Sequence, residues 1–287
     1  MKPNELYARI TATIIELMET HGSDWTRPWV SHRGGMHRNI VTDAPYHGIN
    51  VLLIGRAAYQ RGYDSPLWGT YRQWNAKGGQ VRKGEKGTKV TFWKFFQKQE
   101  DDDSTRKGGA MLRIYTVFNV EQIDGLDLPP IEKNAVEPIE AAQEIIDGYK
   151  GKLAGGMKHG ASVACYKPSH DQICMPEPGD FESMESYYST AFHEMAHSTG
   201  HRTRLNREGV TNPIRFGSHD YSREELVAEL GAAFLCGVTG IDCQEEQSAA
   251  YLASWIKALK NDPRALIVAG GHATKAAQYI TGEQDNV

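Results

Sequence analysis

The sequence lacks any long hydrophobic run. No segment of the 287-residue chain approaches 18 uncharged apolar residues, roughly the length that a membrane-spanning helix needs. The first 22 residues also carry Glu5, Arg9, Glu16 and Glu19 at intervals too short for the apolar stretch of a secretory signal. These absences argue against membrane and secreted proteins, and they predict a cytoplasmic protein with no membrane partner.

Cysteine is also scarce. The four cysteines, Cys165, Cys174, Cys236 and Cys243, include no Cys-x-x-Cys pair, and their spacings match no zinc ribbon. We therefore expect neither a disulfide scaffold nor a cysteine-based zinc site. These residues are interpreted as small buried hydrophobic side chains in a reducing compartment.

Charge is unevenly distributed along the chain. The formal net charge is −4, but residues 1–125 hold 18 Lys or Arg and 13 Asp or Glu, whereas residues 126–287 hold 14 and 23. A chain of this length commonly forms two domains. Because Leu126-Asp127-Leu128-Pro129-Pro130 interrupts the pattern where the charge changes sign, we predict domains at 1–125 and 137–287, joined by a linker at 126–136.

The periodicity of apolar residues predicts an α+β protein. Expected elements of the first part are helices at 6–21, 49–60 and 65–74, the last opened by Pro66, and strands at 90–96 and 112–120 that pair as an antiparallel hairpin. Helices predominate in the second part, at 138–149, 182–200, 222–237, 245–261 and 262–281, beside short strands at 162–166 and 172–175. The chain should therefore combine an N-terminal α+β domain, containing a small antiparallel sheet, with a mostly helical C-terminal domain.

The sequence His193-Glu194-Met195-Ala196-His197 is the strongest chemical signal. Positions i and i+4 of a helix share one face, so His193 and His197 can present two imidazoles to one ion. This spacing is typical of zincins, in which the two histidines bind zinc and the intervening glutamate accepts a proton from the attacking water. We therefore predict a zinc site with Glu194 as catalytic base, and Zn²⁺ as cofactor, with another divalent ion such as Mn²⁺ as the alternative.

A later acidic helix offers the third ligand. Glu225 and Glu229 share one face of the helix expected at 222–237. We favour Glu225 as the ligand and Glu229 as a residue that orients a histidine, and the reverse assignment stays open. His201 lies i+4 from His197 but is disfavoured, because three ligands on one straight helix cannot surround an ion tetrahedrally.

The basic part of the chain contains both ingredients of a single-stranded nucleic acid interface. Such proteins contact phosphates with cations and stack bases on aromatic side chains. Most aromatic residues are core residues, and most charge runs are only solvated, so the prediction concerns the domain more than any single residue. The candidate contacts are Trp25, Arg27, Trp29, Arg38, Tyr46, Trp68, Arg72, Trp74, Arg82, Lys83, Lys86 and Lys89.

Taken together, these residues resemble the ArdC antirestriction family of conjugative plasmids, whose first domain also resembles the N-terminal part of TraC-type primases. The resemblance spans nearly the whole chain and is carried by residues 25–29, 38–39, 45–50, 78–88, 115–122, 187–201 and 224–230. It implies an N-terminal domain that binds single-stranded DNA and a C-terminal zincin-like metallopeptidase domain. The implied role is protection of incoming plasmid DNA from host restriction.

Two other functions remain open at this stage. The chain could protect DNA by occlusion, with a metal that only holds the fold. A metal-dependent nuclease is a weaker alternative, because phosphodiester hydrolysis usually requires carboxylate-rich sites, often with two ions. In the favoured hypothesis, the substrate belongs to one of two classes, host restriction proteins or other DNA-bound proteins. The sequence does not identify the individual protein.

Overall fold

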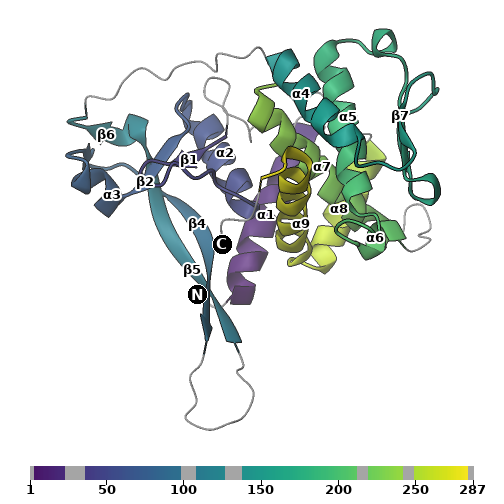
Figure 1. Ribbon diagram of the computed structural model, residues 1–287. Coiled ribbons are helices and arrows are strands. Elements are labelled where there is room, and N and C mark those ends of the chain that lie inside the picture. The colour runs from purple at the N-terminus through teal and green to yellow at the C-terminus, as the bar shows by residue number, and fades with distance from the viewer. Residues whose placement is uncertain are drawn as a thin grey trace.

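The computed structural model describes residues 3–22, 36–97, 108–126, 138–211, 219–241 and 249–283. The fold is α+β, as predicted, with the sheet and the helical bundle side by side (Figure 1). The predicted linker at 126–136 lies outside these ranges except for Leu126, so the exact domain boundary stays a prediction. In the described ranges, no helix is long and apolar enough to cross a membrane.

The N-terminal half is built on a four-stranded sheet with the order β1-β2-β5-β4. The predicted hairpin is confirmed: β4 and β5 pair antiparallel from Thr88 opposite Val117 to Gln97 opposite Gly108. A separate two-stranded sheet joins β3 and β6. The elements are α1 (Pro3–His21), β1 (Arg38–Asn39), α2 (Ile49–Arg61), β2 (Leu67–Thr70), α3 (Tyr71–Ala76), β3 (Gln80–Val81), β4 (Thr88–Gln97), β5 (Gly108–Asn119), η2 (Val120–Gln122) and β6 (Ile123–Asp124).

The single helix predicted at 65–74 was wrong. Residues 67–70 form β2, which pairs with β5, and α3 begins only after Thr70. The Thr70 hydroxyl accepts a hydrogen bond from the Gln73 amide, and the Gln73 side chain accepts one from the Thr70 amide. This reciprocal capping satisfies two free amide groups at the helix start and fixes the helix there, four residues after Pro66.

The C-terminal half is mostly helical, with a small sheet of order β7-β9-β8 beside the helices. The strand expected at 162–166 is displaced toward the C-terminus, to Cys165–Lys167. The elements are α4 (Pro138–Lys150), β7 (Gly156–Lys158), β8 (Cys165–Lys167), η3 (Pro168–His170), β9 (Gln172–Cys174), η4 (Pro178–Asp180), α5 (Met184–Thr199), α6 (Glu208–Thr211), α7 (His219–Thr239), α8 (Ala249–Asn261) and α9 (Ala265–Thr281).

The main hydrophobic core joins the two halves. It contains apolar side chains of α1 and the first turn of α2 together with side chains of α4, α5, α7, α8 and α9. A smaller core beneath the N-terminal sheet takes Ile54, Ala57 and Ala58 from the remainder of α2. Helix α2 therefore contributes to both cores, and its first residues abut α9, where the Gly48 amide donates to the Thr274 hydroxyl over 2.9 Å.

Candidate metal centre

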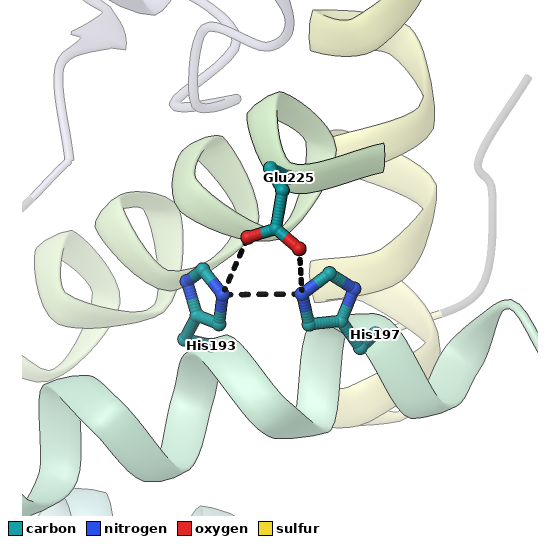
Figure 2. A group of neighbouring side chains, drawn as sticks. All are labelled: His193, His197 and Glu225. Carbon is teal, nitrogen blue, oxygen red and sulfur yellow. Dashed lines mark hydrogen bonds and ion pairs between the residues drawn. The ribbon is translucent and has the colours of Figure 1, made fainter. Parts of the chain in front are cut away.

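Helix α5 carries the His-Glu-x-x-His sequence and has a defined start and end. The Ser183 hydroxyl accepts from the Ser186 amide and caps the first turn, and Gly200 follows the last helical residue. Within the helix, the side chains of His193 and His197 extend from one face toward α7 (Figure 2). The two imidazole Nε2 atoms lie 3.1 Å apart.

Helix α7 lies close enough to α5 to supply a third group. At the closest approach, a Cβ added to Gly231 would stand 2.9 Å from the Cβ of Ala196, so glycine permits this packing. One helical turn and a half earlier, Glu225 extends from α7 between the two histidines (Figure 2). Its carboxylate oxygens lie 3.6 Å from His193 Nε2 and 3.5 Å from His197 Nε2.

These three side chains have the geometry of a metal site. One donor atom from each of His193, His197 and Glu225 lies within 4.8 Å of the others, and among the described residues this is the one group of three such side chains with that spacing. Bonds of about 2.0–2.1 Å to a tetrahedral ion place its donor atoms about 3.3 Å apart. The two Nε2 atoms, 3.1 Å apart, lie close to that value, and each is 3.5 or 3.6 Å from a different oxygen of Glu225. The residues present therefore fit a divalent ion held by two imidazoles and one carboxylate.

The opposite ring nitrogen of each histidine faces its own carboxylate. His193 Nδ1 lies 3.7 Å from Glu229, whose orienting role stays a prediction. His197 Nδ1 lies 3.4 Å from Glu224 Oε1. The sequence alone does not predict a role for Glu224 beside Glu225. Adjacent helical residues point about 100° apart, so only the packing of the helices shows that both side chains reach α5.

Arg207 holds Glu224 in place. Its guanidinium contacts both carboxylate oxygens, with Nε 3.0 Å from Oε2 and Nη2 2.6 Å from Oε1. It also donates to the Thr199 hydroxyl over 2.7 Å and to the Ala196 carbonyl over 2.8 Å at the end of α5. Both ionic side chains are buried. Arg207 thus ties α5 to α7 directly behind His197.

A second arginine of the same segment forms a different buried ion pair. Arg204 donates to both carboxylate oxygens of Asp171, with Nη1 3.0 Å from Oδ2. It also donates to the Ser198 carbonyl, and so ties the end of α5 to the residue before β9. Burial opposes ionisation of Asp171, but hydrogen bonds from Arg204, the Ala154 amide and Tyr166 outweigh it and hold the pKa of Asp171 well below its usual range.

The site concentrates negative charge around the histidines. Burial alone would lower the pKa of His197, but hydrogen bonds to Glu224 and Glu225 and the charge of Glu225 raise it to about 9. Burial of Glu225 is likewise outweighed by the two histidines, which lower its pKa. In the protein without metal, the carboxylates therefore stabilise the protonated form of His197.

Glu194, the predicted base, is buried beside its histidine neighbours. Its charge, after burial and Cys174, contributes to the raised pKa of the Cys165 thiol on β8. His201, the disfavoured ligand, contacts the Thr203 hydroxyl over 2.8 Å and is not a member of the donor group.

The structure places only some of the residues predicted to contact DNA. The predicted stacking residues Trp25 and Trp29, and the predicted phosphate contact Arg27, lie outside the described residues. Trp68 and Trp74 are fully buried, with indole N–H groups that donate to His37 Nδ1 and to the Phe118 carbonyl. Tyr46 is also buried. A buried ring offers no face to a base, so the prediction was wrong for Trp68, Trp74 and Tyr46.

The predicted phosphate contacts are mostly at the surface. Arg38 is partly exposed and pairs with Asp43 over 3.2 Å. Arg82 is held by Glu85, Asp124 and the Glu121 carbonyl. The remaining four cations are exposed: Arg72, Lys83, Lys86 and Lys89. Sequence reasoning missed two exposed aromatic residues of the hairpin, Phe92 and Tyr115, because a strand pattern alone does not say where a sheet leaves its core.

Two families match successive parts of the chain. Residues 4–118 match the N-terminal domain of anti-restriction factor ArdC, and residues 141–272 match the zincin-like metallopeptidase family. A crystal structure of the antirestriction ArdC protein from plasmid R388, in a metal-free state, is 35% identical, covers 96% of both chains and superposes with a TM-score of 0.78. The chain belongs to the ArdC antirestriction family.

The other relatives of this ArdC-family chain are consistent with that assignment. The Mn(II)-bound structure of the R388 protein superposes with a TM-score of 0.76 over 98% of each chain, at 35% identity. The uncharacterized protein y4eC of Sinorhizobium fredii is 36% identical over 99% of this chain and 94% of its own length. DNA primase TraC of Escherichia coli is 36% identical, but this ArdC-family chain spans only 27% of it. Membership in the family implies an interaction with DNA.

Proposed function

We propose that this chain is a metal-dependent peptidase that binds single-stranded DNA and protects incoming plasmid DNA during conjugation. The observation that carries the peptidase proposal is the donor group of His193, His197 and Glu225 with the buried carboxylate of Glu194 beside it. In the proposed division of labour, residues 137–287 form the peptidase and residues 1–125 bind DNA.

His193, His197 and Glu225 would hold the metal. Two imidazoles and one carboxylate are the ligand set of thermolysin-like catalytic zinc sites, and Zn²⁺ is the proposed ion. Mn²⁺ is the alternative, because a relative of the same family has been solved in a Mn(II)-bound form. When bound, the ion supplies Lewis acidity to the substrate carbonyl and to the attacking water.

The remaining site residues move or hold protons. Glu194 accepts a proton from the water and returns it to the leaving amine, because its carboxylate is fixed on the same helix as both histidines. Glu224 accepts a hydrogen bond from His197 Nδ1, and the carboxylate of Glu229 lies 3.7 Å from His193 Nδ1. Both carboxylates therefore favour a proton on Nδ1, which leaves the Nε2 lone pairs directed at the metal position.

The family supports DNA binding by the N-terminal half, and the surface chemistry agrees with it. Exposed cations at Arg72, Lys83, Lys86 and Lys89 can contact phosphates. Single-stranded DNA is the proposed form, because the resemblance to the ArdC family implies it. The protein substrate is proposed to be a host restriction protein or another protein bound to that DNA.

The variant Glu194→Gln tests the peptidase proposal. It should retain one equivalent of metal and wild-type affinity for a labelled oligo(dT) strand, but lose hydrolysis of a quenched fluorescent peptide library. Glu185→Gln, in the first turn of the same helix, is the matched control and should keep all three properties. Retained hydrolysis in Glu194→Gln would sink the mechanism. If instead Glu194→Gln protects plasmid DNA from restriction as well as wild type, protection is by occlusion.

A further inference from the structure

Two aromatic side chains are left exposed in the middle of the β4–β5 hairpin. Phe92 and Tyr115 are 45% and 40% exposed, although both belong to the sheet face that carries the buried Val90 and Val117. Among the side chains that the structure describes, Val90 and Val117 are the hairpin residues of the smaller core, and the hairpin continues beyond them (Figure 1). The two rings therefore lie where the sheet leaves its core.

The rings form a defined surface rather than two isolated side chains. Their centroids are 5.6 Å apart in an edge-to-face contact, and Phe92 also contacts the buried ring of Tyr46 at 6.3 Å. The buried ring of Tyr46 therefore supports the exposed ring of Phe92 and limits its movement. Rigid aromatic faces lose little conformational entropy when a flat ligand stacks on them.

Arg113 adds a positive charge to this surface. It is the cross-strand partner of Phe92, so its side chain leaves the same sheet face, and it is exposed. A cation beside two exposed rings complements a ligand that carries both a flat apolar ring and a phosphate, which is the chemistry of a nucleotide unit.

We propose that Phe92, Tyr115 and Arg113 form a stacking surface for unpaired bases of single-stranded DNA. Unpaired bases are required, because in a duplex both faces of each base are already stacked on their neighbours. Stacking on aromatic rings tolerates every base, so the surface would bind without sequence preference. The inference deepens the proposed function and rests on its DNA-binding part, while it is independent of the metal.

The experiment compares two probes with equal phosphate content. Labelled oligo(dT) and an abasic strand of the same length are titrated with the full chain by fluorescence anisotropy. Wild type should bind oligo(dT) more tightly than the abasic strand, because only the former can stack. The double variant Phe92→Leu/Tyr115→Leu should bind oligo(dT) roughly 10- to 100-fold more weakly, and should bind the abasic strand as wild type does.

Two further variants separate stacking from loss of structure. Phe92→Trp retains a flat ring and should keep the preference for oligo(dT). Tyr59→Leu/Tyr71→Leu removes two aromatic rings of similar exposure, 53% and 49%, on other elements of the same half, and should change nothing. Arg113→Gln should lower the slope of log affinity against log salt by about 0.7, the value expected for one lost phosphate contact on a single strand.

Each outcome has one meaning. If Phe92→Leu/Tyr115→Leu keeps its oligo(dT) affinity, or loses affinity for both strands equally, the stacking surface is overturned while DNA binding by the protein stands. If wild type binds neither strand, the DNA-binding part of the proposed function fails and this inference fails with it. A wild type that binds both strands equally overturns stacking alone.

Discussion

Two buried ion pairs lie three residues apart in the segment that follows α5, and they differ in what lies beyond them. Arg204 pairs with Asp171, whose other partners are a backbone amide and a tyrosine hydroxyl. Arg207 pairs with Glu224, whose second contact is the ring of His197. The chemistry of the two pairs is the same. Only the second pair is connected to a proposed metal ligand.

The comparison shows how one segment can serve both stability and function. Each arginine donates to carbonyl groups at the end of α5, where helix carbonyls lack partners within the helix. Both therefore hold the end of α5 against a neighbouring element. The contribution of Glu224 to metal binding can therefore be separated from its contribution to stability by comparison with Asp171. The Asp171–Arg204 pair serves as the reference, because it contacts no proposed metal ligand.

Removal of one carboxylate from each pair should have the largest effect. Glu224→Ala and Asp171→Ala each leave a buried guanidinium uncompensated, which costs about 3–5 kcal/mol of unfolding free energy. Only Glu224→Ala should also weaken Zn²⁺ binding, by about 10- to 100-fold, because His197 loses the acceptor that orients it. Denaturant unfolding of the metal-free protein and a chelator competition measure the two effects. Equal losses of Zn²⁺ affinity in both variants would show that Glu224 has no role in metal binding beyond its contribution to the fold.

Replacement of both partners should separate stability from metal binding. Arg207→Met/Glu224→Leu and Arg204→Met/Asp171→Leu remove charge and countercharge together, so each should recover most of the stability lost in the single variants. The first should still bind Zn²⁺ about 10-fold more weakly than wild type, and the second as wild type does. Restored metal affinity in the Arg207→Met/Glu224→Leu protein would mean that Glu224 acts only through the fold.

A smaller test uses glycine. A Cβ added to Gly209 would stand 2.8 Å from the Cβ of Glu224, so Gly209→Ala should cost about 1–3 kcal/mol and displace the carboxylate. Gly148 in α4 has no atom within 4 Å of that position, so Gly148→Ala should stabilise the protein by about 0.5–1 kcal/mol. Thermal unfolding with and without Zn²⁺ distinguishes them, since only Gly209→Ala should reduce the stabilisation that Zn²⁺ provides.

The smallest expected effect is the change with pH in the stability that the Asp171–Arg204 pair contributes. This contribution does not change with pH near neutrality. The pKa of Asp171 is lower in the folded than in the unfolded protein, so the folded state binds fewer protons. The contribution of the pair is thus fully present above about pH 4, the unfolded value, and is lost as the pH falls below it. Wild type should approach the stability of Asp171→Asn in acid. A constant difference between the two down to pH 2 would contradict this.

The parts of the site that could be predicted from the sequence are those fixed within one helix. His193, Glu194 and His197 follow from helical spacing alone. The choice among Glu224, Glu225 and Glu229 could not be made in this way, because it depends on how α7 lies against α5, which the close contact of Gly231 and Ala196 sets. Arg207 was missed for the same reason.

The fold was predictable where local signals agree with the packing. The alternation of apolar residues predicts the hairpin correctly, whereas Pro66 predicts a helix start that residues 67–70 do not adopt, because they pair with β5 as β2. The reciprocal Thr70–Gln73 cap was readable in the sequence and would have placed the start of α3. Burial of Trp68 and Trp74 was not readable, since the same aromatic residues serve equally well in a core or on a binding surface.

The sharing of α2 between the two cores has a consequence for the integrity of the chain. Ile49, Val51 and Leu52 pack with the helices of the C-terminal half, and the α1 hydroxyl of Thr11 donates to the Pro263 carbonyl over 2.7 Å. Two separate polypeptides, 1–126 and 138–287, should therefore complement each other and co-elute as one particle when produced together. Produced alone, each would expose the apolar surface that the other covers, and should aggregate.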